Sequence, residues 1–208
     1  MKILVADDHA AVRLGLKHIL QSAFSTLEFA EASTSAEALK LATSHEWDMI
    51  ILDIDLPGRN GLDVLKQLQE QSVQAPVLIF SFHHEDQFAV RALKAGAWGF
   101  LSKDAPDTEI IKSIRQILSG RKYITLHVAE IMASQLTTPG EGQVHELLSD
   151  REYETFLLLA AGKTVSEIAS QLSLGIPTIS TYRSRVLEKM QMKNNAELTR
   201  YAMENKLI

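Results

Sequence analysis

The sequence predicts an α/β domain built on a doubly wound, five-stranded parallel sheet, followed by a small all-α domain. Over residues 1–120, short apolar runs alternate with amphipathic segments, as strands and helices do in a parallel sheet. Beyond residue 120 the apolar spacing is helical throughout. Residues 137–143 (TTPGEGQ) are poor in apolar side chains and carry Pro and Gly, which is typical of a linker. We therefore expect domains at residues 1–120 and 146–208, joined by a linker at 121–145 that includes a helix.

Five apolar runs are the expected strands, and the domain is organised around the third. Residues 49–52 (MIIL) form an unbroken apolar run, the pattern of a strand that is buried on both faces. Asp53 follows without a spacer, and turn residues then lead to a helix that begins near Leu62. The expected strands are residues 3–6, 27–31, 49–52, 76–80 and 98–101.

A helix is expected after each strand, at residues 126–136 and throughout residues 146–208. Thr34 and Glu37 form the S/T-x-x-E pattern of a capping box, which opens the helix after the second strand. The start signals in the second domain are Ser149 with Glu152, Thr164 with Glu167, Pro177 in a first turn, and Asn194 with Glu197.

Composition excludes several classes of protein. The 208 residues include no cysteine, so disulfides and thiolate metal sites are impossible. No apolar run approaches the roughly 18 residues of a membrane span, and acids occur too early in MKILVADDH for a signal peptide. We therefore expect a cytoplasmic protein with no membrane partner. The net charge of -5 argues against a uniformly basic nucleic-acid coat.

Polar side chains follow four of the expected strands. Asp7 and Asp8 follow the first, Asp53 the third, Ser81 the fourth and Lys103 the fifth. Ligands of open α/β sheets bind beyond the carboxyl ends of the strands, so these side chains are expected to share one crevice. Clustered carboxylates repel one another unless a cation offsets them, and oxygen ligands favour Mg²⁺. A hydroxyl and an ammonium suit phosphate oxygens, so the set predicts a phosphoryl-accepting aspartate.

These residues resemble the receiver domains of bacterial response regulators, which have a flavodoxin-like sheet. The resemblance rests on order and spacing over residues 1 to about 120. The matching residues are Asp7-Asp8, Asp53 with Leu56-Pro57 and Asn60-Gly61, Ser81, and Lys103 three residues after Phe100.

The resemblance implies that a sensor histidine kinase or a small phosphodonor phosphorylates Asp53. It implies that Asp8 and Asp53 hold Mg²⁺ with the backbone carbonyl of Asp55, and that Asp7 assists. Ser81 and Lys103 would contact the phosphoryl group. Ser81 and Phe100 would form the switch, with Phe100 where many receivers carry Tyr.

The same residues allow other interpretations. Asp53-Ile54-Asp55 also matches the D-x-D motif of haloacid-dehalogenase-like phosphatases, which would make the chain an enzyme. The motif follows the third strand rather than the first, so we expect no enzyme. A metal site at His83 and His84 is not expected, because no third nitrogen or sulfur ligand is evident. His9 is expected to start a helix rather than to bind a metal.

Residues 147–208 resemble the LuxR-type helix-turn-helix domain. A helix at residues 165–172, a turn at Leu174-Gly175 and a helix at residues 176–190 form the bihelical unit. A plain four-helix bundle with a solvated basic face is the alternative. With both halves, the chain resembles a NarL/FixJ-type response regulator: a transcription factor that binds double-stranded DNA and forms a homodimer when phosphorylated.

The second helix of the unit is expected to contact DNA. Apolar character places Ile176, Ile179, Val186 and Leu187 on its packed face. Pro177 stands where many family members carry a basic residue. The expected DNA contacts are Thr178, Ser180, Thr181 and Ser184 for bases, Arg183, Arg185 and Lys193 for phosphates, and the basic residue Lys189.

Overall fold

The computed structural model describes residues 1–137, 144–205 and 207–208. The chain divides into two compact units, Met1–Thr137 and Thr138–Ile208. The core of the predicted linker, residues 138–143, lies outside the described residues. Within the described residues, no helix is both long and apolar enough to cross a membrane.

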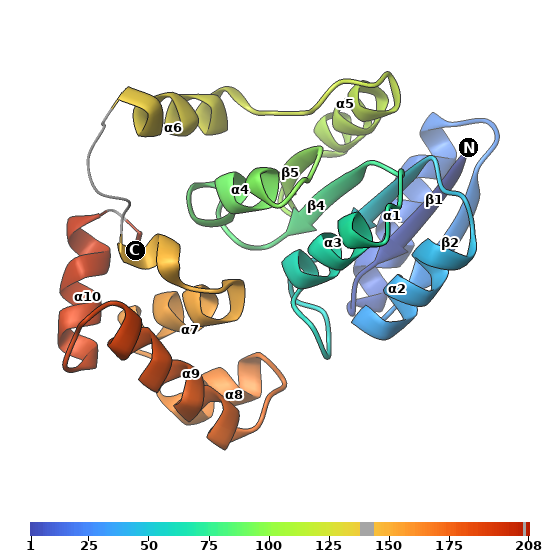
Figure 1. Ribbon diagram of the computed structural model, residues 1–208. Coiled ribbons are helices and arrows are strands. Elements are labelled where there is room, and N and C mark those ends of the chain that lie inside the picture. The colour runs from blue at the N-terminus through green and yellow to red at the C-terminus, as the bar shows by residue number, and fades with distance from the viewer. Residues whose placement is uncertain (138–143, 206) are drawn as a thin grey trace. The chain divides into compact units, whose positions relative to one another are not determined.

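The first unit contains the predicted five-stranded parallel sheet, with strand order β2-β1-β3-β4-β5 (Figure 1). The chain runs outward in both directions from the neighbouring strands β1 and β3, which places the topological switch point between them. The strands are β1 (Lys2–Ala6), β2 (Glu28–Ala32), β3 (Met49–Leu52), β4 (Val77–Ser81) and β5 (Gly99–Ser102). The helices of this unit are α1 (Ala10–Ala23), α2 (Ser35–Ser44), α3 (Gly61–Glu70), α4 (Glu85–Lys94), α5 (Asp107–Leu118) and α6 (Leu126–Thr137).

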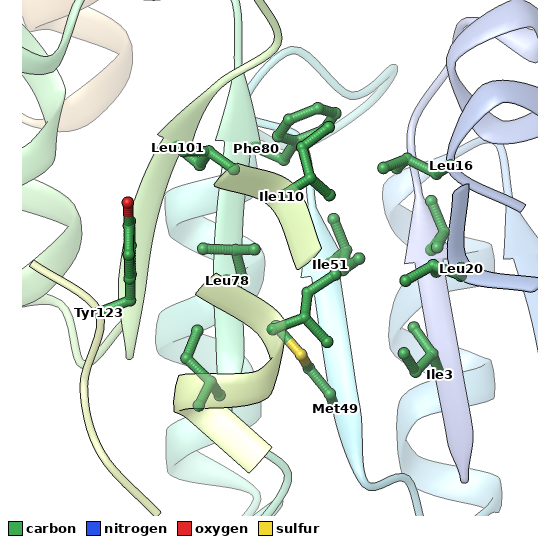
Figure 2. Close-up of a cluster of buried hydrophobic side chains, with 13 residues drawn as sticks. Ile3, Leu16, Leu20, Met49, Ile51, Leu78, Phe80, Leu101, Ile110 and Tyr123 are labelled. Atoms are coloured by element: carbon green, nitrogen blue, oxygen red, sulfur yellow. The ribbon is translucent and has the colours of Figure 1, made fainter. Parts of the chain in front are cut away.

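Two layers of helices cover the sheet. Helices α1 and α5 lie side by side on one face, and α2 and α3 on the other. Strands β1 and β3 lie inside the sheet, and helices cover both of its faces. Successive side chains of a strand point to opposite faces, so nearly all side chains of these two strands are buried. This is why residues 3–6 and 49–52 are apolar without a break. Figure 2 shows the cluster on the α1 and α5 side. Its members are Ile3, Val5, Leu16, Leu20, Met49, Ile51, Leu78, Phe80, Leu101, Ile110, Ile114, Ile117 and Tyr123.

Three residues just before α6 and in its first turn are bonded to α5 and α4. The hydroxyl of Tyr123 donates to Glu109 over 2.7 Å. The hydroxyl of Thr125 donates to the carboxylate of Glu85, 2.9 Å away, in the first turn of α4. The next residue of α4, Asp86, is paired with His127. Helix α6, at the position the sequence predicts, is therefore anchored to α4.

The second unit is all-helical, as predicted. It contains a 3₁₀ turn, η1 (Val144–Leu147), which the sequence did not indicate, and then α7 (Asp150–Ala160), α8 (Val165–Gln171), α9 (Ile176–Lys189) and α10 (Asn195–Glu204). The predicted start signals are confirmed in the hydrogen bonds: the side chain of Glu152 accepts from the Ser149 amide over 2.9 Å, and that of Asn194 accepts from the Glu197 amide over 3.1 Å.

The packed face of α9 differs from the prediction at one residue. Ile179 and Val186 are fully buried, as expected. Ile176 is 53% exposed, so its predicted place in the core is wrong. Ile176 is the first residue of the helix, and Pro177 follows it directly. Apolar periodicity identifies a helix face, but it does not say whether another element extends far enough to cover the first turn.

Candidate functional site

The polar residues after the strands are aligned by continued sheet hydrogen bonds. The amide of Asp7 donates to Ala32 over 3.0 Å, and that of Asp53 donates to Ala6 over 2.9 Å. The amide of Lys103 donates to the carbonyl of Ser81 over 2.9 Å. Each residue thus keeps the register of the strand before it. Asp7 and Asp53 follow β1 and β3, so the two acids lie at the topological switch point.

Lys103 joins the two buried acids. Its ammonium lies 2.7 Å from a carboxylate oxygen of Asp7 and 2.7 Å from Oδ2 of Asp53. The three side chains are no more than 2% exposed. Burial raises the pKa of Asp53 to about 6, although the attraction of Lys103 acts in the opposite direction. Burial alone would lower the pKa of Lys103, but the two carboxylates outweigh it and the pKa is raised.

One oxygen of Asp53 has no hydrogen-bond donor among the described residues. This atom, Oδ1, is buried. Carboxylate oxygens of Asp7, Asp8 and Asp53 and a ring nitrogen of His9 all lie within 4.8 Å of one another. A buried acceptor without a donor is costly unless a cation or another donor meets it. The donor set is mainly oxygen, so the residues fit a hard divalent cation such as Mg²⁺.

His9 is closer to the acids than the sequence suggested. It precedes the first residue of α1, the position expected for it. Its Nδ1 also lies 2.6 Å from a carboxylate oxygen of Asp8, and its amide donates to Asp7 over 2.8 Å. The half-exposed ring therefore borders the site. Proximity of the ring to Asp8 depends on its rotamer, which a sequence does not specify.

The turn between β3 and α3 is held from two sides. Gly61 packs so tightly that a Cβ there would stand 2.0 Å from the carbonyl oxygen of Asp53. The side chain of Asn60 caps α3 by accepting from Leu62 over 2.8 Å. From the other side, Ser35 at the start of α2 donates its hydroxyl to the carbonyl of Pro57 over 3.0 Å. The turn residues that the sequence indicated thus fix the backbone directly after Asp53.

The remaining predicted residues of the first unit lie on or after β3, β4 and β5. Ser81 is fully buried at the end of β4, and its hydroxyl accepts from the His83 amide over 3.3 Å. The carboxylate of Asp55 lies 3.0 Å from Nε2 of His83. Phe100 is buried in β5, opposite Ile79 in the register. The sequence indicates neither the contact of His83 with Asp55 nor the bonds of Ser35, because each joins residues that are far apart in the chain.

In the second unit, the hydroxyl residues predicted to contact bases lie on the exposed surface of α9. Thr178, Ser180, Thr181 and Ser184 are all exposed. The hydroxyl of Thr181 donates to the carbonyl of Pro177 over 2.9 Å, and that of Ser184 donates to Ser180 over 3.0 Å. Because these two hydroxyl protons are used within the helix, Thr181 and Ser184 offer mainly acceptor lone pairs to a ligand.

The basic residues predicted to contact DNA differ in their surroundings. The ammonium of Lys189 lies 2.6 Å from Glu152 of α7, and Nε of Arg183 donates to Asn195 over 2.8 Å. Both side chains are therefore engaged within the second unit. Arg185 and Lys193 are exposed, and their side chains have no ion pair or hydrogen bond among the described residues.

Two family models cover most of the chain. "Response regulator receiver domain" matches residues 3–115, and "Bacterial regulatory proteins, luxR family" matches residues 146–202. The phosphatase alternative has no support from these matches, since the family is one of transcription regulators.

Relatives match the chain over its whole length. The transcriptional activator protein ExaE of Pseudomonas putida is 38% identical, covering 100% of this chain and 98% of its own. The response regulator UvrY of Escherichia coli K12 is 31% identical, covering 100% and 95%. In fold, the chain is similar to RcsB of Salmonella enterica serovar Typhimurium, bound to promoter rprA in the presence of the phosphomimetic BeF3-, with a TM-score of 0.66, 21% identity and 97% coverage of both chains. The chain belongs to the NarL/FixJ-like two-component response regulators, transcription regulators with a receiver domain and a LuxR-type DNA-binding domain.

Proposed function

We propose that Asp53 accepts a phosphoryl group from a sensor histidine kinase or a small phosphodonor. The observation that supports this most directly is the buried Asp53 carboxylate, with Oδ2 on Lys103 and Oδ1 without a donor among the described residues. A carboxylate oxygen of Asp53 attacks the phosphorus while the bond to the donor's nitrogen or oxygen breaks. The product is an acyl phosphate on Asp53, and the donor leaves with the electron pair.

Lys103 and the acids around Asp53 have separate proposed roles. The ammonium of Lys103 neutralises phosphoryl oxygens as they arrive, because it already lies within 2.7 Å of the accepting carboxylate. Asp8, Asp53 and the backbone carbonyl of Asp55 would hold Mg²⁺, with Asp7 assisting. When bound, Mg²⁺ supplies positive charge that offsets the carboxylates and attracts phosphoryl oxygens.

Removing the metal is expected to stop phosphorylation. Incubation with acetyl phosphate and Mg²⁺ should add one phosphoryl group to the chain, detected by intact mass spectrometry and located on Asp53 by peptide mapping. An excess of EDTA should abolish this product, and an excess of Mg²⁺ over EDTA should restore it. Equal labelling with and without EDTA would refute the proposed role of the metal.

We further propose that Ser81 and Phe100 transmit the change to α4. The phosphoryl group carries roughly 1.5 to 2 negative charges in place of the single charge of the carboxylate, and it brings new acceptor oxygens. The Ser81 hydroxyl is the group able to turn toward them. Phe100 and α4 would then move inward and favour a homodimer. Thr125 and His127 are bonded to Glu85 and Asp86 in the first turn of α4. A displacement of α4 would therefore be passed on to α6.

In the DNA-binding domain, we propose that α9 enters the major groove of double-stranded DNA. Short hydroxyl side chains would contact bases, and Arg185 and Lys193 would contact phosphates. The exposure of these residues supports this assignment. Lys189 stays a predicted contact, but DNA would have to compete with Glu152 for its ammonium. A dimer would meet half-sites about 10 base pairs apart.

Phosphate and base contacts are expected to differ in their salt dependence. Arg185→Ala and Lys193→Ala should each weaken binding about equally across sequences, and each should reduce the slope of log K against log salt by roughly one unit. Ser180→Ala should instead change which bases are preferred. Fluorescence anisotropy with labelled duplexes at several salt concentrations measures both effects.

The control for this experiment is Arg200→Ala. Arg200 is an exposed basic residue of α10, so the variant removes the same charge from another helix of the same domain. Its salt slope should equal that of the unmodified chain. If Arg185→Ala kept the full slope and lost discrimination between sites, the phosphate and base roles would have to be exchanged.

A further inference from the structure

Phe82 lies over the acidic site, and the proposed transfer assigns it no role. It follows Ser81 directly, and its ring centre lies 5.0 Å from the ammonium of Lys103. The ring of His9 meets it edge-on, with centroids 6.3 Å apart. Phe82 therefore contacts residues that follow two other strands, β1 and β5, at the same edge of the sheet.

The exposures of Phe82 and Lys103 are the reverse of what their chemistry favours. A charged lysine is almost never fully buried, and a large aromatic ring is usually covered. Here the side chain of Lys103 is 2% exposed, while Phe82 is 53% exposed. The ring takes a solvent-facing position above the cation, and the attraction between a cation and an aromatic face holds it there.

We propose that Phe82 is a cover that determines how long Asp53 stays phosphorylated. The inference rests on the proposed phosphorylation of Asp53. Loss of the group is a hydrolysis: water attacks the phosphorus, the bond to the Asp53 oxygen breaks, and the carboxylate is restored. Inorganic phosphate leaves with the oxygen and both protons of the water. The step requires water beside the phosphoryl group. A ring over the Lys103 side of the site excludes water from one approach.

The proposed protection from water requires an aromatic side chain at position 82. An alanine leaves the approach open, because nothing of the ring remains. A leucine keeps apolar bulk but has no aromatic face for Lys103, so it would stand over the site for a smaller fraction of the time. The rate of hydrolysis should therefore follow the order Phe82→Ala, Phe82→Leu, unmodified chain, from fastest to slowest.

The test is the half-life of the phosphorylated chain. Full-length protein is labelled with acetyl phosphate and Mg²⁺, the donor is removed, and the remaining phosphoprotein is followed on phosphate-affinity gels. The half-life of Phe82→Ala should be shorter by about threefold or more. This factor corresponds to the free energy of one partly exposed cation–π contact. Phe82→Leu should fall between this variant and the unmodified chain. In denaturant, all three acyl phosphates should hydrolyse at one rate, because the cover exists only in the folded protein.

Phe29→Ala is the matched control. Phe29 in β2 has the ammonium of Lys17 at 5.6 Å from its ring centre. The variant therefore removes the same type of contact from the outer strand opposite β5. Its half-life should equal that of the unmodified chain. A Phe82→Ala half-life equal to that of the unmodified chain, or an equal shortening in Phe29→Ala, would overturn the inference. No labelling of the unmodified chain would instead refute the proposed function, and the inference with it.

Discussion

Replacing Asp53 by Asn is expected to abolish phosphorylation while the receiver domain stays folded. Asn is nearly the same size as Asp, and its carbonyl oxygen can accept the hydrogen bond from Lys103 that Oδ2 accepts over 2.7 Å. The amide removes the nucleophilic carboxylate, so no acyl phosphate can form. Intact mass spectrometry after incubation with acetyl phosphate and Mg²⁺ should show no phosphorylated chain. Circular dichroism should show the unmodified helical content.

Asp104→Asn is the control for this variant. Asp104 follows Lys103 at the same edge of the sheet but is exposed. Its replacement removes one carboxylate near the site without touching Asp53, so phosphorylation should continue at the unmodified rate. Full labelling of Asp53→Asn would move the phosphoacceptor to another acid of the cluster and refute the assignment.

The second large effect is expected from Gly61→Ala. The added Cβ would stand 2.0 Å from the carbonyl oxygen of Asp53 and 2.9 Å from Cα of Ile54. Both are backbone atoms, so the turn after β3 must move as a whole. We expect the free energy of unfolding to fall by about 3 kcal/mol, the upper end of the cost of overpacking. The displaced Asp53 should also be phosphorylated more slowly in the fraction that stays folded.

Gly15→Ala tests whether the effect is steric. Gly15 lies within α1, and a Cβ there would meet nothing within 4 Å. This variant should stabilise the protein by roughly 0.5 to 1 kcal/mol, the difference between Gly and Ala inside a helix. Urea denaturation of both variants measures the free energies. A Gly61→Ala variant as stable as Gly15→Ala would show that the turn relaxes without cost.

The fold could be predicted from the sequence because its signals are local. Parallel strands covered on both faces need unbroken apolar runs, and residues 49–52 show this most clearly. The confirmed helix starts at Ser149 and Asn194 depend on residues three positions apart. The meeting of Asp7, Asp53 and Lys103 was also predictable, because strand ends at one edge of a sheet are neighbours wherever they lie in the sequence.

The structural features that could not be predicted from the sequence depend on side-chain rotamers and on packing between distant segments. The bonds of Ser35 to the turn after Asp53 join residues more than 20 positions apart, and no spacing rule indicates them. The places of Phe82 and His9 over the site depend on how each side chain turns. The exposure of Ile176 depends on whether another element covers the first turn of α9. These features need coordinates because they arise between elements.

The anchoring of α6 to α4 is another feature that the sequence does not indicate. Periodicity indicated a helix in the predicted linker, and the structure places it within the first unit. Thr125 and His127 are bonded to α4 through side chains that are about 40 positions away. The predicted linker at 121–145 therefore includes a segment anchored to the element that we propose to move on phosphorylation.

The central claim is that phosphorylation of Asp53 controls DNA binding, and one measurement tests it most directly. The full-length chain is used to select duplexes from a random-sequence pool, and its affinity for the selected duplex is measured at one salt concentration, with and without acetyl phosphate and Mg²⁺. We predict that phosphorylation raises the affinity of the unmodified chain and leaves that of Asp53→Asn unchanged. Equal affinity of the unmodified chain in both conditions, or an increase that persists in Asp53→Asn, would contradict the claim.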